Sequence, residues 1–407
     1  MKIRYLAVFS LTAFLLTGLM GQNAQSATFS GRSSSVIEFF DDADEDTAIP
    51  VYQYLMLNVS DIDDDGMRFR SYGRLATDTQ NEVDVDSRLY YAYLEKKGAF
   101  NDRLDYRLGR QFVITTAGAS VMDGLDLTVN NLGPVNVRAF GGGDATYYEN
   151  YDSDNLVWGA EVYGTFFNDL DLGVSYLQKW DNSSLTKELI GLDVDYDKDN
   201  LINLYSELQF NYINDVVSYF LAGAKYYRSP KWNLRTEYLY SLPVFTSTSI
   251  YSVFAAEEYE EIMGEFTYNI ALGLRAFGRI THEMYDEFSD ANVFEAGVEK
   301  IRSDRFSGYL AGVYRDDEDG QDLKGIKARI GYMFNKYLHA GVGANIDSLD
   351  RRIDLEDDED DTTSDLYWAY ASINFNKKMN LQLKMERASS DLWDEYYRGR
   401  ARFNISF

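Results

Sequence analysis

Three arginines close to the C-terminal end of the chain stand at every second position. Arg398, Arg400 and Arg402 alternate with Gly399 and Ala401. Because successive side chains of a β-strand point to opposite faces of a sheet, the three guanidinium groups would form a row on one face. Guanidinium groups bind carboxylates and other anions, and a row of them along a water-filled passage favours anionic solutes. The chemistry that this segment indicates is the electrostatic selection of solutes.

More arginines follow the same alternation near the start of the chain. One group alternates with Phe69 and Leu75, and a second group alternates with Leu104 and Leu108. The candidate selectivity residues are Arg68, Arg70, Arg74, Arg103, Arg107, Arg398, Arg400 and Arg402. Closure of the sheet into a barrel would make the last strand a neighbour of the first and bring early and late arginines to one wall. The alternative is that these arginines pair with luminal Asp and Glu residues and brace the sheet.

Residues for bond-breaking chemistry are scarce. The chain has two histidines, His282 and His339, and neither has a serine and an acid at a recognisable spacing. It has no cysteine, which excludes disulfides, covalently attached haem and thiolate metal sites. We therefore expect neither an enzyme nor a bound cofactor.

The sequence pattern predicts that the arginines lie on a long series of strands. Segments of roughly 9–13 residues alternate polar and apolar side chains, as in transmembrane barrels. The connections alternate between short turns such as 229–231 and longer polar loops such as 388–394. We predict an all-β fold, a transmembrane antiparallel up-and-down β-barrel, with a best count of about 22 strands. The segment from Phe245 to Asn269 is ambiguous, so about 18–22 strands fit the pattern, and a soluble β-sandwich is the alternative fold.

Composition supports the barrel and limits the partners. Aromatic residues make up 15% of the chain, with 33 Tyr and 24 Phe. Tyrosine suits the boundary between membrane and water, where barrels carry aromatic girdles. The net charge of −27 argues against nucleic-acid binding, because phosphates would be repelled.

The N-terminal residues have the pattern of a secretory signal peptide. Lys2 and Arg4 precede an apolar run that ends near Met20, and small residues around Ser26 and Ala27 suit cleavage. We expect two regions, a signal peptide over 1–26 and a single barrel domain over 27–407. No later stretch is long and apolar enough for a transmembrane helix.

Runs of acidic residues fall mostly in predicted extracellular loops. The densest one could bind a divalent cation weakly, and could bridge it to lipopolysaccharide, because carboxylate oxygens are the usual Ca²⁺ and Mg²⁺ ligands. The candidate ligands are Glu356, Asp357, Asp358 and Asp360. The alternative is that these charges only keep the loops soluble.

Two motifs resemble those of Gram-negative outer-membrane porins. One is the strand Leu108-Gly109-Arg110-Gln111 followed by Asp123-Gly124, and the other is the aromatic C-terminal strand. The resemblance implies a bacterial outer-membrane location and recognition by the barrel-assembly machinery, and both a homotrimer and a monomer stay open. The implied assembly signal consists of Phe403, Ile405 and Phe407. The intervening segment, Val113 to Ser120, is either a constriction loop that folds inward or an ordinary outer loop.

The function that we predict is passive diffusion of small hydrophilic solutes or ions through a porin-like channel lined by arginines. One alternative is a structural sheath whose lumen holds a partner such as a multihaem cytochrome. Another is an adhesin or assembly protein that makes its contacts through the acidic loops.

Overall fold

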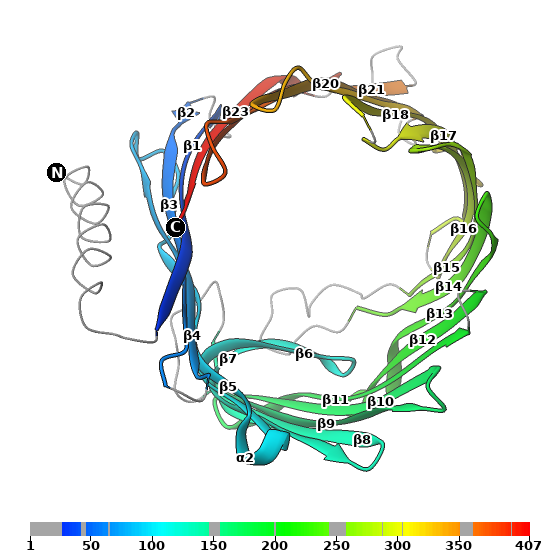
Figure 1. The fold of residues 1–407 in the computed structure, drawn as a ribbon. Helices are drawn as coiled ribbons and strands as arrows, with labels where there is room; N and C mark the ends of the chain where they lie inside the picture. The colour runs from blue at the N-terminus through cyan, green and yellow to red at the C-terminus, as the bar shows by residue number, and fades with distance from the viewer. Residues whose placement is uncertain are drawn as a thin grey trace.

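The computed structural model describes most of the chain after the predicted signal peptide, which lies outside the described residues. The described ranges are 27–41, 46–63, 66–145, 155–198, 201–243, 258–286, 288–302, 304–350, 361–391 and 393–407. Strands dominate these ranges (Figure 1), because the period-2 alternation of the sequence suits a sheet with two different faces. Among the described residues, no helix has the length and hydropathy to cross a membrane.

The strands follow one another along the chain with one short helix. The first half contains β1 (Thr28–Asp41), β2 (Thr47–Ala48), β3 (Pro50–Ser60), β4 (Arg68–Asp78), β5 (Arg88–Gly98), α2 (Ala99–Asp102), β6 (Leu104–Thr115), β7 (Gly118–Leu132), β8 (Val135–Asp144), β9 (Leu156–Phe166), β10 (Leu170–Asp181) and β11 (Ser184–Lys198). The second half contains β12 (Ile202–Asn211), β13 (Val216–Ser229), β14 (Trp232–Ser241), β15 (Tyr259–Ala271), β16 (Leu274–Tyr285), β17 (Ala291–Lys300), β18 (Phe306–Asp317), β19 (Leu323–Met333), β20 (Leu338–Asp350), β21 (Asp361–Asn374), β22 (Met379–Ser390) and β23 (Trp393–Ser406).

The sheet closes on itself where the first strand meets the last. β1 pairs antiparallel with β23, from Arg32 opposite Ser406 to Phe40 opposite Arg398, and pairs with β3 on its other side. Every other strand pairs with its neighbours in the chain, so the wall forms the ring seen in Figure 1. This closed ring confirms the predicted barrel, and the alternative of a soluble sandwich is wrong.

The wall consists of 22 strands, although the labels run to β23. β2 pairs with β1 in the same register as β3, since Phe40 lies opposite Ala48 and Ile37 lies opposite Val51. β2 and β3 are therefore one strand with an interruption at Ile49. The described part of the ambiguous segment belongs to β15, which pairs directly with β14. The best predicted count is confirmed.

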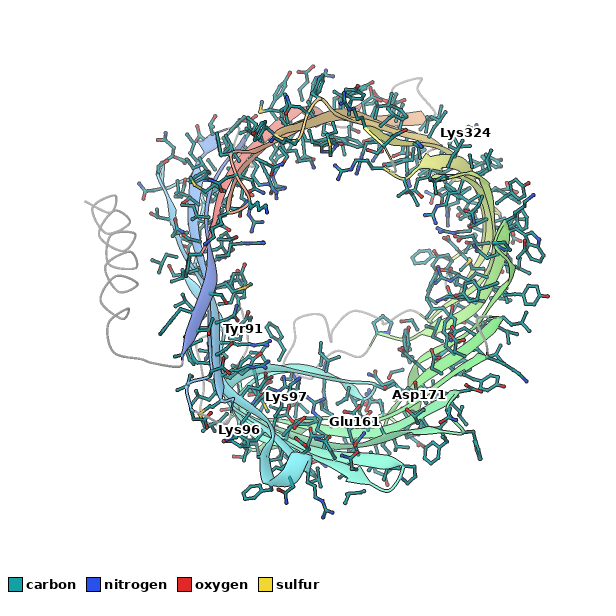
Figure 2. The ribbon with its side chains drawn as sticks, in the orientation of Figure 1. Tyr91, Lys96, Lys97, Glu161, Asp171 and Lys324 are labelled. Atoms are coloured by element: carbon teal, nitrogen blue, oxygen red, sulfur yellow. The ribbon has the colours of Figure 1, made fainter. Side chains whose placement is uncertain are left out.

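The two faces of the wall differ in polarity. On the outer face, apolar side chains such as Ile37, Leu108 and Val342 are exposed, as a lipid-facing surface requires. On β1, the inner-face residues Ser34 and Glu38 alternate with outward-facing residues such as Ile37. In Figure 2 the labelled Tyr91 points into the ring and Lys324 lies on its outer side.

One predicted connection is wrong. The sequence analysis placed a long loop over 388–394, but β22 continues to Ser390 and β23 begins at Trp393. Ser390 pairs with Trp393, so the ladder extends almost to the end of the hairpin. Polar residues in this region form strand and do not form a loop.

Glycines allow two strands to approach closely where β6 meets β5. The backbone of Gly109 has φ +126°, and a Cβ at this position would overlap the carbonyl oxygen of Ala92. A side chain is therefore excluded on both conformational and steric grounds. This explains the glycine in the motif that resembles porins.

We predict that Gly109→Ala destabilises the barrel. The strained φ alone costs about 1–3 kcal/mol, and the overlap with Ala92 adds to this cost. The measurement is the urea concentration at the midpoint of unfolding. The folded fraction is monitored by the heat-dependent shift of the barrel band in gel electrophoresis. The matched control is Gly264→Ala, because no atom lies within 4 Å of the Cβ position there. Equal midpoints for the two variants would contradict the prediction.

Candidate functional site

The distal half of the β6–β7 hairpin leaves the wall and folds into the barrel. In Figure 1 these two strands lie inside the ring formed by β8 to β11. β5 pairs with β6 only from Ala92 to Lys96, and this pairing ends at Arg110. Beyond Arg110 the hairpin continues with its own ladder as far as Thr115 opposite Gly118. The structure therefore supports the inward alternative for the segment between these strands.

Hydrogen bonds fasten the hairpin tip to the luminal face of three wall strands. The Ala117 amide donates to Ser175 Oγ at 2.8 Å, and Gln209 Nε2 donates to the Ala117 carbonyl at 2.9 Å. The Thr116 hydroxyl donates to Asp193 Oδ1 at 2.8 Å. These partners lie on β10, β12 and β11 respectively, so the tip is held at both its backbone and a side chain.

An apolar cluster lies between the hairpin and the wall. The hairpin contributes Val113, Ala117 and Met122, and the wall contributes four residues from β8 to β11. The wall residues are Phe140, Val157, Leu177 and Leu189. All members are buried, and burial of this apolar surface stabilises the docked position at roughly 25 cal/mol per Å². The hairpin thus covers a patch of apolar residues on the luminal face of β8 to β11.

The opposite face of the hairpin is exposed to the lumen. Ile114 is 69% exposed and Phe112 is 40% exposed. These residues alternate with Val113, which is buried against the wall. The hairpin therefore narrows the passage and presents two apolar side chains at the narrowed level.

Ion pairs brace the wall beside the hairpin. Arg107 Nη2 and Arg138 Nη2 lie 2.6 Å and 2.9 Å from Asp126 Oδ2, and Arg138 Nη1 lies 3.3 Å from a Glu161 oxygen. Asp126 is 1% exposed. Removal of either arginine would leave a buried charge without full compensation. Arg107, one of the candidate selectivity residues, thus has the partner that the bracing alternative requires.

Other candidate arginines gather on one wall because the barrel closes. Tyr54 on β3 lies opposite both Ser34 on β1 and Arg74 on β4, which places Arg74 on the inner face. Arg402 on β23 lies opposite Val36 of the same inner face of β1. We call the luminal face of β23, β1, β3 and β4 the seam wall. Its arginines from the candidate set are Arg68, Arg70, Arg74, Arg398, Arg400 and Arg402.

The seam-wall arginines differ in their partners. Arg398 forms an ion pair with Glu38 at 3.2 Å, and Arg70 lies 3.8 Å from Glu95. Arg400 and Arg402 form no ion pair with any described residue. Arg402 instead donates from Nε to Asn404 Oδ1 at 3.1 Å. Part of the positive charge on this wall is therefore not neutralised by its neighbours.

The wall across the ring carries ion-paired charges. Arg279 Nη2 lies 2.6 Å from a Glu265 oxygen on the neighbouring strand. Arg275 Nε donates to Glu299 at 2.7 Å. These residues belong to β15, β16 and β17, which Figure 1 places opposite the seam wall. The arginines on these strands therefore differ from Arg400 and Arg402 of the seam wall, because each has a carboxylate partner.

Arg103 does not lie on this wall. The sequence analysis placed it on the inner face of a strand, but it lies in the turn between α2 and β6, and its amide donates to the Ala99 carbonyl. Left-handed backbone conformations at Phe100 and Asn101 form this turn and delay the start of β6 to Leu104. The predicted strand position of Arg103 is wrong, and its role in selectivity stays a prediction.

The sequence analysis missed a row of luminal tyrosines. Tyr54 and Tyr72 stack with ring centroids 6.1 Å apart, and Tyr72 stacks on Tyr90 at 4.9 Å. The row continues to Tyr52 on one side and to Tyr91, whose position is labelled in Figure 2, on the other. Paired tyrosines at two-residue spacing were a signal in the sequence, but their contact across strands depends on the register.

The residues of the predicted assembly signal lie at the C-terminal end of the chain. Phe403 and Ile405 lie on the outer face of β23, and the Phe403 ring packs 6.3 Å from Phe375. The Phe407 amide donates to the Gly31 carbonyl. Their recognition by the assembly machinery stays a prediction.

The candidate metal ligands Glu356, Asp357, Asp358 and Asp360 lie outside the described residues. In the part of the chain that the structure describes, no three metal-ligating side chains cluster together.

Comparison with known proteins finds similarity in fold only. No protein-family profile and no curated protein matches the sequence. Pseudomonas aeruginosa OpdQ has a TM-score of 0.50 and 10% identity, with 94% of this chain and 99% of that chain covered. The chain has the porin-type barrel fold.

Two other solved structures are less similar. The PapC usher translocation pore of the P pilus has a TM-score of 0.49 and 10% identity, covering 93% of this chain and 100% of its own. Acinetobacter baumannii OccAB1 has a TM-score of 0.41 and 12% identity, covering 95% and 99%.

We predict that Gly191→Val displaces the hairpin of the porin-type barrel. A Cβ at Gly191 would overlap the amide nitrogen of Ala117, and overpacking of this kind costs about 1–3 kcal/mol. A hairpin that docks less firmly should fluctuate, so single-channel recordings should show more current noise and the tip should become sensitive to protease. The control is Gly264→Val, which points to open space. A quiet channel with a protected tip would show that the hairpin is not held by this contact.

Proposed function

We propose that this protein is a channel of the bacterial outer membrane through which small hydrophilic solutes or ions diffuse. The observation that carries the proposal is a closed wall with an apolar outer face, a polar inner face and the β6–β7 hairpin docked against the inside. Wide barrels of this type enclose an aqueous passage. In Figure 2 the described side chains project from the wall and leave the centre of the ring unfilled.

The docked hairpin favours a channel over a sheath. A partner that filled the lumen would need the space that the hairpin occupies beside β8 to β11. A diffusion channel, by contrast, uses such a hairpin to limit the size of the solute. The proposed activity is transport and does not involve catalysis.

Charge on the seam wall would set the ion preference. Arg400 and Arg74 lack an ion pair among the described residues. Arg74 hydrogen-bonds to the Asp86 carbonyl and to Tyr54, and it lies over the Tyr52 ring. Unpaired cations attract anions more strongly than paired ones, because a carboxylate partner cancels most of the field at a distance. We therefore expect these two arginines to raise the permeability of anions.

We predict that the double variant Arg74→Gln/Arg400→Gln shifts permeability towards cations. The measurement is the zero-current potential across a planar bilayer with a salt gradient, and the shift should shrink at high salt because of screening. Lys324→Gln is the control, since Lys324 lies on the outer side of the wall. The control should keep the potential of the unmodified channel.

Two outcomes would contradict this account. A purified, folded protein that does not conduct would refute the channel. A conducting double variant with an unchanged zero-current potential would refute the role of the seam-wall arginines and leave the channel in place.

A further inference from the structure

The inner wall contains a strongly basic pocket at the end of the barrel with the short turns. It has a volume of about 250 Å³ and lies where β21, β22, β23 and β1 meet the turn between Asn374 and Met379. We call it the mouth pocket. Its charged lining consists of Arg32, Lys377, Lys378 and Arg402.

No carboxylate side chain lines the mouth pocket. Its other polar residues are amides and a hydroxyl, including Asn380, Asn404 and Ser406. None of the four cations forms an ion pair with a described residue, and the C-terminal carboxylate of Phe407 is not within ion-pair distance of them either. Four like charges around one cavity repel one another, so an anion inside it would relieve that repulsion.

A hydrogen-bond network orients the lining groups. Ser34 donates to Asn404 Oδ1 at 2.6 Å, and Asn404 Nδ2 donates to Asn380 Oδ1 at 2.7 Å. Arg402 Nε donates to the same Asn404 oxygen at 3.1 Å. Arg402 Nη2 also donates to Ser34 Oγ at 3.5 Å. Ser34 and Asn404 are buried and orient the Arg402 guanidinium, whose five N–H groups exceed the number of these bonds.

The lysines are held by the backbone of the turn. The Lys378 amide donates to Asn376 Oδ1 at 2.8 Å, and the Ser406 amide donates to the Lys378 carbonyl at 2.7 Å. These bonds fix the turn to the end of β23. The backbone from which the two lysines extend is therefore fixed beside β23.

We propose that the mouth pocket binds the phosphate group of small solutes. A phosphate monoester carries about −1.5 to −2 charges and three acceptor oxygens, which matches several cations and many N–H donors better than the single charge of a carboxylate does. Arginine binds phosphate through two parallel hydrogen bonds. The proposal rests on the channel function only for the route by which the solute arrives.

Titration calorimetry of the full-length protein in detergent tests the proposal. Inorganic phosphate is the probe, acetate is the comparison anion, and ionic strength is kept constant. The variants are Arg32→Gln/Arg402→Gln and, in the exposed turn, Lys377→Gln/Lys378→Gln. The control is Lys327→Gln/Arg329→Gln, which removes two charges from the inner face of β19, outside the pocket.

We expect saturable phosphate binding that either pocket variant weakens by about tenfold or more, since each variant removes two charged hydrogen-bond donors. The control should bind phosphate like the unmodified protein. If the arginine variant does not fold, the turn variant decides the question.

The proposal is wrong if the unmodified protein shows no saturable phosphate binding, if acetate binds as tightly, or if the control loses as much affinity as the pocket variants. Bilayer conductance of the same samples separates this result from the proposed function. A conducting protein that does not bind phosphate refutes only the pocket, and a protein that binds phosphate without conducting refutes only the channel.

Discussion

The requirement that every backbone N–H and C=O group within a bilayer be hydrogen-bonded determines this structure. An open sheet would expose the edges of its first and last strands to lipid, at a cost of several kcal/mol per unsatisfied group. The pairing of β1 with β23 removes both edges, and the register from Arg32 to Phe40 extends it across most of β1. Ring closure is therefore the contact on which the separation of lipid and water depends.

Closure also assembles the candidate functional surface. Arg74 and Arg402 are far apart in the sequence, but both belong to the seam wall because the last strand joins the first. The same closure brings Arg32 and Arg402 to the mouth pocket. On the far wall, arginines face glutamates on neighbouring strands and are neutralised. The seam wall thus carries both arginines without an ion pair and the mouth pocket, and the docked hairpin narrows the passage elsewhere on the wall.

Local pattern was sufficient to predict much of this fold. Alternation along strands such as β4 and β23 gave the class, the polarity of the two faces and the strand number, because a period of two depends only on neighbouring residues. It failed where backbone geometry intervened, as at Arg103, where a left-handed turn replaces the first strand residue. It failed again at 388–394, because polar residues continue a ladder when the partner strand is long enough.

The candidate site was less predictable because its properties depend on partners far apart in the sequence. Arg107 and Arg400 look alike in the sequence, yet Asp126 neutralises one of them and no described carboxylate pairs with the other. The inward position of the hairpin depends on Ser175, Asp193 and Gln209, which no motif links to it. The tyrosine row depends on register in the same way.

Site-directed labelling of β23 tests most directly the central claim that the wall has water on its inner face and lipid on its outer face. The chain has no native cysteine, so the label attaches only at the introduced position. Single cysteines would be placed at each position from 400 to 405, and each variant would be reconstituted into lipid vesicles. One experiment measures the reaction of each cysteine with a water-soluble thiol reagent. A second experiment attaches a fluorophore to each cysteine and measures the quenching of its fluorescence by brominated lipid. The account predicts reaction with the water-soluble reagent at 400, 402 and 404, and quenching by lipid at 401, 403 and 405. The opposite pattern, or no alternation, would contradict a wall with water inside and lipid outside.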